Sequence, residues 1–171
     1  MKPLHNPLFL KFIVYFNENQ DYFECHEVLE EFWKSIPNRT KNHPLTAYIL
    51  LSTGLYHFRR DNKIGAQRTL LKAYSKMTTM TEDAPEYTEG IDFNLLCKDI
   101  KNMLHRLENN LTYQTFQINI ISKELELLVS DMKLIMDLLP IGSDDVIHKH
   151  MLRDRTDILL IRDKKKKDRE Y

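Results

Sequence analysis

The sequence contains few of the residues that interrupt regular structure. Its 171 residues include only 4 Gly and 6 Pro, which is about half the usual combined share of these two residues. A β-sandwich or barrel needs a turn roughly every ten residues, so this scarcity argues against both folds. Two Cys are too few for a disulfide scaffold. A chain of this length is expected to form one domain, with or without an appendage.

The chain also lacks an excess of charge and a long apolar run. It has 25 Lys and Arg against 25 Asp and Glu, which removes the simplest argument for a nucleic-acid-binding protein. The longest apolar stretch near the N-terminus, residues 8–16, is interrupted by Lys11 and is too short to span a bilayer. No signal-peptide cleavage site follows it. We therefore expect a cytoplasmic protein without membrane contact, in which Cys25 and Cys97 are reduced, buried thiols.

A helical pattern extends along nearly the whole chain. Apolar residues recur three and four positions apart and predict an all-α protein, with helices at about 7–17, 22–36, 45–60, 63–77, 93–107, 122–139 and 143–156. Residues 78–90 contain helix breakers and are expected to form an exposed loop. Apolar residues approach alternation only at 113–121, which favours a short extended segment there.

An internal repeat appears at a shift of 41 residues. The matched pairs are Asp21 with Asn62, Cys25 with Ala66, Leu29 with Leu70, and Trp33 with Tyr74. Two helices joined by a tight polar turn, with a small residue on the inner face, are typical of tetratricopeptide-like hairpins. We predict a compact helical bundle that comprises a double hairpin at 1–78, a helical extension packed on it at 79–161, and a basic, disordered tail at 162–171.

Polar residues of the second predicted helix form the candidate site. His26 lies at the margin of the apolar stripe, Glu30 follows one turn later, and Glu27 lies on the same side. His57, near the end of the third helix, is the expected partner from the neighbouring hairpin. One interpretation is a metal-dependent hydrolase, in which His26, Glu30 and His57 are the ligands and Glu27 is a base.

Two other interpretations use the same residues. Six acidic and no basic residues occur from 17 to 31, and these carboxylates can pair with the basic second hairpin in a purely structural ion network. The expected pairs join Glu27, Glu30 and Glu31 to Arg59, Arg60, Lys63 and Arg68. Alternatively, a pocket beside Trp33 binds a small organic ligand or a peptide.

These residues also carry a resemblance to a known family. Residues 21–33, preceded by Asn17, contain His26-Glu27-x-x-Glu30-x-x-Trp33, and residues 55–66 contain Tyr56-His57-x-x-Arg60-x-Asn62-x-x-Gly65-Ala66. Both motifs resemble signatures of domain of unknown function family 309, which comprises small helical proteins of bacteria and archaea. The resemblance covers residues 15–77 and implies an all-helical fold without an established activity. It singles out a constellation of His26, Glu27, Glu30, Trp33, His57, Arg60 and Asn62.

The chain departs from the family pattern at three positions. The family usually has Gln where this chain has Leu50, and Gly where it has Gln20 and Asp61. If a family site uses that Gln, the site of this chain is altered.

The C-terminal region is a second candidate for binding. Residues 146–171 contain nine Lys and Arg against five Asp and Glu, but no aromatic residue for base stacking except the terminal Tyr171. We expect a solvated tail. Contact with nucleic acid or with an acidic partner is kept as an alternative, as is pairing with the acidic second helix of another molecule.

The sequence contains no complete catalytic set. It has no glycine-rich phosphate loop, no Gly-x-Ser-x-Gly and no evident Cys/His nucleophile arrangement. Together with the hairpin repeat, this predicts a non-enzymatic interaction or scaffold protein without a cofactor, whose partner is another protein or a second copy. A small-molecule ligand and the metal-dependent hydrolase remain as alternatives.

Overall fold

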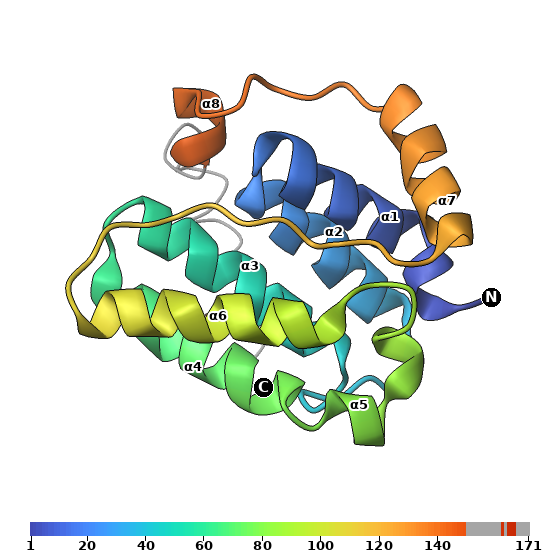
Figure 1. Ribbon diagram of the computed structural model, residues 1–171, viewed down its shortest axis with the longest axis horizontal. Helices are drawn as coiled ribbons and strands as arrows, with labels where there is room; N and C mark the ends of the chain where they lie inside the picture. The colour runs from blue at the N-terminus through green and yellow to red at the C-terminus, as the bar shows by residue number, and fades with distance from the viewer. Residues whose placement is uncertain (150–161, 163, 167–171) are drawn as a thin grey trace.

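The computed structural model describes residues 1–149, 162 and 164–166 and confirms the all-α prediction (Figure 1). Within these residues the longer helices are α1 (Pro7–Val14), α2 (Tyr22–Ser35), α3 (Leu45–Arg59), α4 (Lys63–Met77), α6 (Phe93–Glu108) and α7 (Lys123–Leu134). Short helices are α5 (Met80–Asp83) and α8 (Asp144–Ile147), with single turns at Pro3–His5, Tyr15–Asn19 and Pro85–Tyr87. None of the described helices combines the length and the apolar character that a bilayer crossing requires.

Side-chain caps determine where several of these helices begin. Asp21, Asn62 and Asp92 each accept a hydrogen bond from the backbone N–H three residues later, at 3.1, 3.2 and 3.1 Å. Gln20 and Asp61, which precede the first two caps, have left-handed φ values of 51° and 63°. Both copies of the predicted repeat therefore begin with the same local geometry.

Helix α3 is the central helix of the bundle and packs between α2 and α4. It is buried on most sides, as predicted from its sequence. A Cβ atom at Gly54 would lie 2.6 Å from the side chain of Leu70, so the glycine allows α4 to approach closely. Cys25 and Ala66, the small residues of the repeat, are fully buried. The likeness of the two hairpins to tetratricopeptide repeats stays a prediction.

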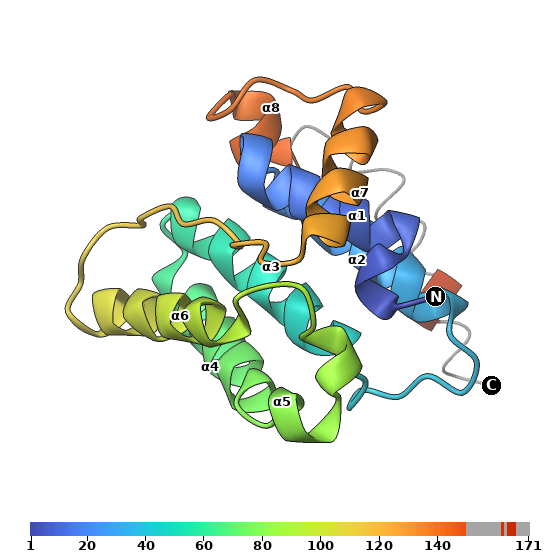
Figure 2. The same ribbon diagram turned by 45° about the vertical axis from the view of Figure 1, so that its right-hand side comes forward.

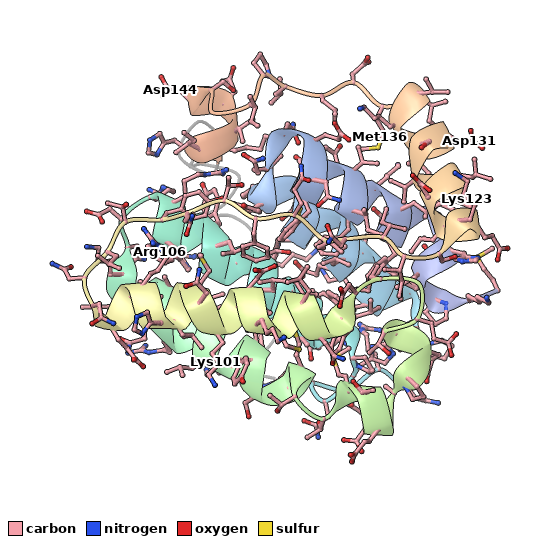
Figure 3. All side chains as sticks on the ribbon, in the orientation of Figure 1. Lys101, Arg106, Lys123, Asp131, Met136 and Asp144 are labelled. Carbon is pink, nitrogen blue, oxygen red and sulfur yellow. The ribbon has the colours of Figure 1, made fainter. Side chains whose placement is uncertain are left out.

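The chain between α6 and α7 is extended, as the alternating pattern at 113–121 predicted, and it crosses the bundle in Figure 1. Arg106, labelled in Figure 3, donates from Nε to the Thr112 carbonyl oxygen at 2.8 Å and holds the start of this segment. Asn17 then exchanges two hydrogen bonds of 2.9 and 2.8 Å with the backbone of Ile118. Helix α7 follows and lies against α1 (Figure 2).

Two sequence predictions are wrong at element boundaries. Residues 78–90 are mostly exposed, as predicted, but they are not a loop throughout: they contain α5 and a further turn at Pro85–Tyr87, and Met80, Ala84 and Thr88 are buried. The helix predicted for 122–139 ends at Leu134. Leu134 and Ile135 are 84% and 79% exposed, so continued helix would gain no packing there.

Two further predictions reach beyond the described residues. In the region predicted as helix at 143–156, α8 covers Asp144–Ile147, and residues 150–156 lie outside the described part. The predicted tail at 162–171 also lies largely outside it. Its described residues, 162 and 164–166, are exposed but helical rather than disordered. Both cysteines are free; Cys25 is buried and Cys97 is half-buried.

Candidate functional site

The first turn of α2 is tied to the C-terminal region. The Asp21 carboxylate is 1% exposed, and Lys149 Nζ lies 2.7 Å from Asp21 Oδ2 and 3.1 Å from Glu24 Oε1. Burial alone would lower the pKa of Lys149, but hydrogen bonds and charge from Asp21 and Glu24 raise it overall. Pairing of the basic C-terminus with the acidic helix is thus intramolecular at Lys149.

Tyr22 and Arg59 join the same structural cluster. The Arg59 guanidinium lies over the Tyr22 ring, 4.7 Å from its centroid, and donates to the carbonyl oxygens of Gln20 at 2.6 Å and Val146 at 3.4 Å. The Tyr22 hydroxyl is hydrogen-bonded to the hydroxyl of Tyr113. Burial raises the pKa of Tyr22 well above its usual range. These contacts hold distant segments together and give the beginning of the motif a structural role.

His26, Glu27 and Glu30 form a polar cluster on the next turns of α2. His26 Nδ1 lies 3.4 Å from Glu27 Oε1, and its Nε2 lies 3.6 Å from Glu30 Oε2. All three side chains are partly exposed, at 32%, 42% and 31%. In the described part of the chain, this is the one group of three potential metal ligands whose atoms lie within 4.8 Å of one another.

His57 lies near the turn between α3 and α4, apart from the polar cluster of His26, Glu27 and Glu30. Asn62, which caps α4, places Nδ2 3.2 Å from His57 Nδ1. Burial and the charge of Arg60 lower the pKa of His57. Arg60 itself lies over the Tyr56 ring and donates from Nε to His148 Nδ1 at 3.3 Å. His57 does not belong to the ligand group of the described residues, so the predicted set of His26, Glu30 and His57 is not assembled.

The ion network predicted between the hairpins is not formed by Glu30, Arg59 or Lys63 in the described part of the chain. Glu30 pairs within its own helix, with Lys34 Nζ 2.7 Å from Glu30 Oε1. Arg59 binds backbone oxygens instead, and Lys63 donates to Asn110 Oδ1 at 2.6 Å. Among these described residues, the carboxylate of Glu30 does not meet the basic second hairpin.

A groove of about 450 Å³ opens between α2 and α3, and we call it the Trp33 groove. It is lined by His26, Glu30, Trp33, Lys41, Thr46, Ile49, Leu50 and Lys76. Three predicted site residues therefore share one cavity. Leu50, where the family usually has Gln, is part of its wall, so this departure makes the groove more apolar.

The indole of Trp33 is held in place by the loop that follows α2. Its Nε1 donates to the Thr40 carbonyl oxygen at 3.1 Å, and the Arg39 guanidinium lies 5.2 Å from the ring centroid. Lys76 Nζ donates to the Lys41 carbonyl oxygen at 2.8 Å. The sequence patterns missed Lys41 and Lys76, because neither belongs to the apolar stripes or to the motifs.

A second, smaller pocket of about 220 Å³ lies on the other side of His26, and we call it the Phe23 pocket. It is lined by Tyr22, Phe23, His26, Glu27, Thr53 and Tyr56. The imidazole of His26 thus borders both cavities. All four α2 members of the predicted constellation line at least one of them.

Comparison with known proteins agrees with the motif assignment. A family model described as "Domain of unknown function (DUF309)" matches residues 9–69, a range that contains every residue of the predicted constellation. The chain is similar to "Uncharacterized protein YpuF" of Bacillus subtilis (strain 168), with 32% identity over 161 residues that cover 91% of each chain. No solved structure matches. The chain belongs to the DUF309 family of domains of unknown function.

Proposed function

We propose that the protein is a non-enzymatic interaction module that binds a short segment of a protein partner in the Trp33 groove. The observation that carries the proposal is the convergence of His26, Glu30 and Trp33 on one groove. Unlike Asp21 and Tyr22, these side chains are partly exposed. Because they are partly exposed and line a cavity, these side chains are accessible to a partner.

The groove has the chemistry of a peptide site. Trp33, Ile49 and Leu50 supply an apolar surface, while Glu30 and Lys76 supply charges of opposite sign. A volume of about 450 Å³ lies in the range of ligand sites and can hold several side chains. An apolar anchor flanked by polar groups is the usual pattern by which a groove between two helices recognises a chain segment.

Selection from a random-peptide phage library against the full chain tests this function. We expect peptides rich in apolar residues to be enriched and to change the fluorescence of Trp33, the one tryptophan of the chain. Leu50→Lys should abolish binding because it places a charge in the apolar wall. Leu127→Lys is the matched control, since Leu127 is a 55% exposed leucine of α7. Failure to enrich peptides, or binding that survives Leu50→Lys, would contradict the proposal.

The metal-dependent hydrolase remains a second candidate because His26, Glu27 and Glu30 can bring ligand atoms within 4.8 Å of one another. One nitrogen and two carboxylate ligands leave an open coordination position for water, as in catalytic zinc sites. Equilibrium dialysis with Zn²⁺ should then show one ion per chain, and none for His26→Ala. Equal zinc binding by both proteins, or no stoichiometric binding by the first, would rule out this candidate.

A further inference from the structure

We propose that a cavity at the C-terminal end of α4, which we call the Tyr87 cavity, binds a small zwitterion with a carboxylate and an ammonium group, namely an apolar amino acid or dipeptide. This inference goes beyond the proposed function, because it concerns a different cavity and a different class of ligand. The volume of about 520 Å³ lies within the usual range of small-molecule sites. The walls come from the loop before α3, the end of α4, α5 and the turn that follows it (Figure 2), and they include His43, Lys76, Met80, Asp83, Glu86 and Tyr87.

The hydroxyl of Tyr87 is a hydrogen-bond donor that the fold leaves for a ligand. His43 Nδ1 accepts from the Leu45 backbone N–H at 3.2 Å, so the proton of the neutral imidazole is on Nε2. Burial lowers the pKa of His43 more than the charge of Glu86 raises it, which favours this neutral form. His43 Nε2 lies 3.2 Å from the Tyr87 hydroxyl and therefore donates to its oxygen. The hydroxyl hydrogen is then left to bond an acceptor in the cavity that Tyr87 lines.

Contacts with the core hold Tyr87 in this position. Tyr48 of α3 is fully buried and donates from its hydroxyl to the Tyr87 carbonyl oxygen at 2.6 Å. The rings of His43 and Tyr87 pack edge to face, with their centroids 5.2 Å apart. A side chain whose backbone and ring are both held loses little conformational freedom when a ligand binds. The donor is therefore preorganised.

The charged side chains of the cavity favour a zwitterion over a simple anion or cation. Lys76 uses one N–H on the Lys41 carbonyl oxygen, at 2.8 Å, and its ammonium group has two more. In the described part of the chain, no ion pair joins Lys76 to Asp83 or Glu86. These carboxylates would repel a simple anion, and the ammonium group would repel a simple cation. A zwitterion complements both, with its carboxylate on Lys76 and Tyr87 and its ammonium group beside the two carboxylates.

An apolar floor favours apolar side chains on the ligand. Met80 and Ala84 are 4% and 6% exposed, and they line the cavity together with Pro44. A leucine or methionine side chain that packs against them removes further apolar surface from water. An apolar amino acid or dipeptide therefore matches the hydroxyl donor, the two signs of charge and the floor of the cavity at the same time.

Isothermal titration calorimetry of the full chain with leucine, methionine and leucyl-leucine provides the test. We expect at least one of the three to bind. Blocking either charged end of that ligand, by N-acetylation or by C-terminal amidation, should weaken binding at least about tenfold. Tyr87→Phe should weaken the unblocked ligand about fivefold or more, because it removes the hydroxyl and keeps the ring that packs on His43.

A double variant, Asp83→Asn with Glu86→Gln, identifies the site of the ligand's ammonium group. It should bind the free and the acetylated ligand equally, because the carboxylates that distinguish them are gone. Glu82→Gln is the matched control, since Glu82 is an exposed carboxylate of α5 that does not line the cavity. This control should keep the preference for the free ligand.

Failure of all three ligands to bind overturns the inference, as does a blocked ligand that binds as tightly as the free one. Loss of the preference in Glu82→Gln also overturns it, since the effect would then come from the general charge of α5. The groove function is tested separately. Leu50→Lys should leave zwitterion binding unchanged, and Tyr87→Phe should leave the binding of selected groove peptides unchanged. If Leu50→Lys abolished zwitterion binding, the ligand would occupy the Trp33 groove and the assignment to the Tyr87 cavity would be wrong.

Discussion

The two ends of α2 belong to one family motif but make different contacts. Its first turn binds residues far away in the sequence, since Tyr22 is bonded to Tyr113 and Asp21 is paired with Lys149. On the following turns, His26 and Glu30 pair with residues of their own helix and border cavities. The motif therefore combines residues that assemble the fold with residues that shape a surface. Substitutions at the two ends should separate stability from binding.

Asp21→Ala should give the largest loss of stability. The substitution removes the cap of α2 and leaves Lys149, whose side chain is 17% exposed, with Glu24 as its one remaining ion-pair partner among the described residues. We expect the free energy of unfolding to fall by about 3 kcal/mol, as measured by urea denaturation.

Asp21→Asn separates the two causes, because Asn can still cap the helix but cannot pair with the ammonium group. It should lose about half as much stability as Asp21→Ala. A loss below about 1 kcal/mol for Asp21→Ala would show that the first turn is not a structural anchor, and the contrast between the two ends of α2 would disappear.

Tyr22→Phe should cause a smaller loss from the same turn. It removes the hydroxyl that binds Tyr113 but keeps the ring beneath Arg59. The expected loss is about 1 kcal/mol, the usual value for one hydrogen bond. Tyr113→Phe should act through the same bond, so the double variant should lose no more than the larger single loss. Full additivity would mean that the hydroxyls do not stabilise one another.

Much of the fold could be predicted because its signals are local. Asp21, Asn62 and Asp92 begin helices through side-chain caps that depend on residues three positions away. The family pattern gives a further local signal at Gln20 and Asp61. Both residues have positive φ, and the family usually has Gly at these positions. Glycine adopts that conformation without strain, so the pattern marks a turn rather than a site.

The missed features depend on contacts between distant segments. Lys149 is 128 positions from Asp21, and no periodicity connects them. Lys76 enters the Trp33 groove from α4, outside both motifs. The end of α7 at Leu134 likewise depends on where the neighbouring surface stops. The α2 part of the site was predictable from spacing on one helix, whereas the partner assigned to it, His57, required knowledge of how the hairpins pack.

His26→Ala tests the other end of α2. His26 is partly exposed and makes its close polar contacts within α2, so stability should change by less than about 0.5 kcal/mol. Binding of a selected peptide should nevertheless weaken about tenfold or more, because the imidazole borders both cavities. His105→Ala, which changes an exposed histidine of α6, is the control for both measurements. A large loss of stability without a specific loss of binding would assign His26 to the structural end of the motif.

The smallest expected effect is a weak dependence of stability on pH, from histidines that the fold holds neutral. Burial lowers the pKa of both His43 and His57, and the charge of Arg60 lowers that of His57 further. His57 Nδ1 faces the Asn62 amide, and His43 Nδ1 accepts from the Leu45 N–H, so protonation there removes a hydrogen bond.

The unfolded chain therefore binds protons more readily than the folded chain, and the free energy of unfolding should fall as the pH drops from 7.5 to 5.5. Both side chains are partly exposed, so solvent screening keeps the total below about 1 kcal/mol. Urea denaturation at both pH values should show this slope reduced in His43→Gln and in His57→Gln, and reduced most in the double variant. If the double variant kept the full slope, the pH dependence of stability would come from other groups. His57 would then not act as a neutral hydrogen-bond acceptor at the α3–α4 turn.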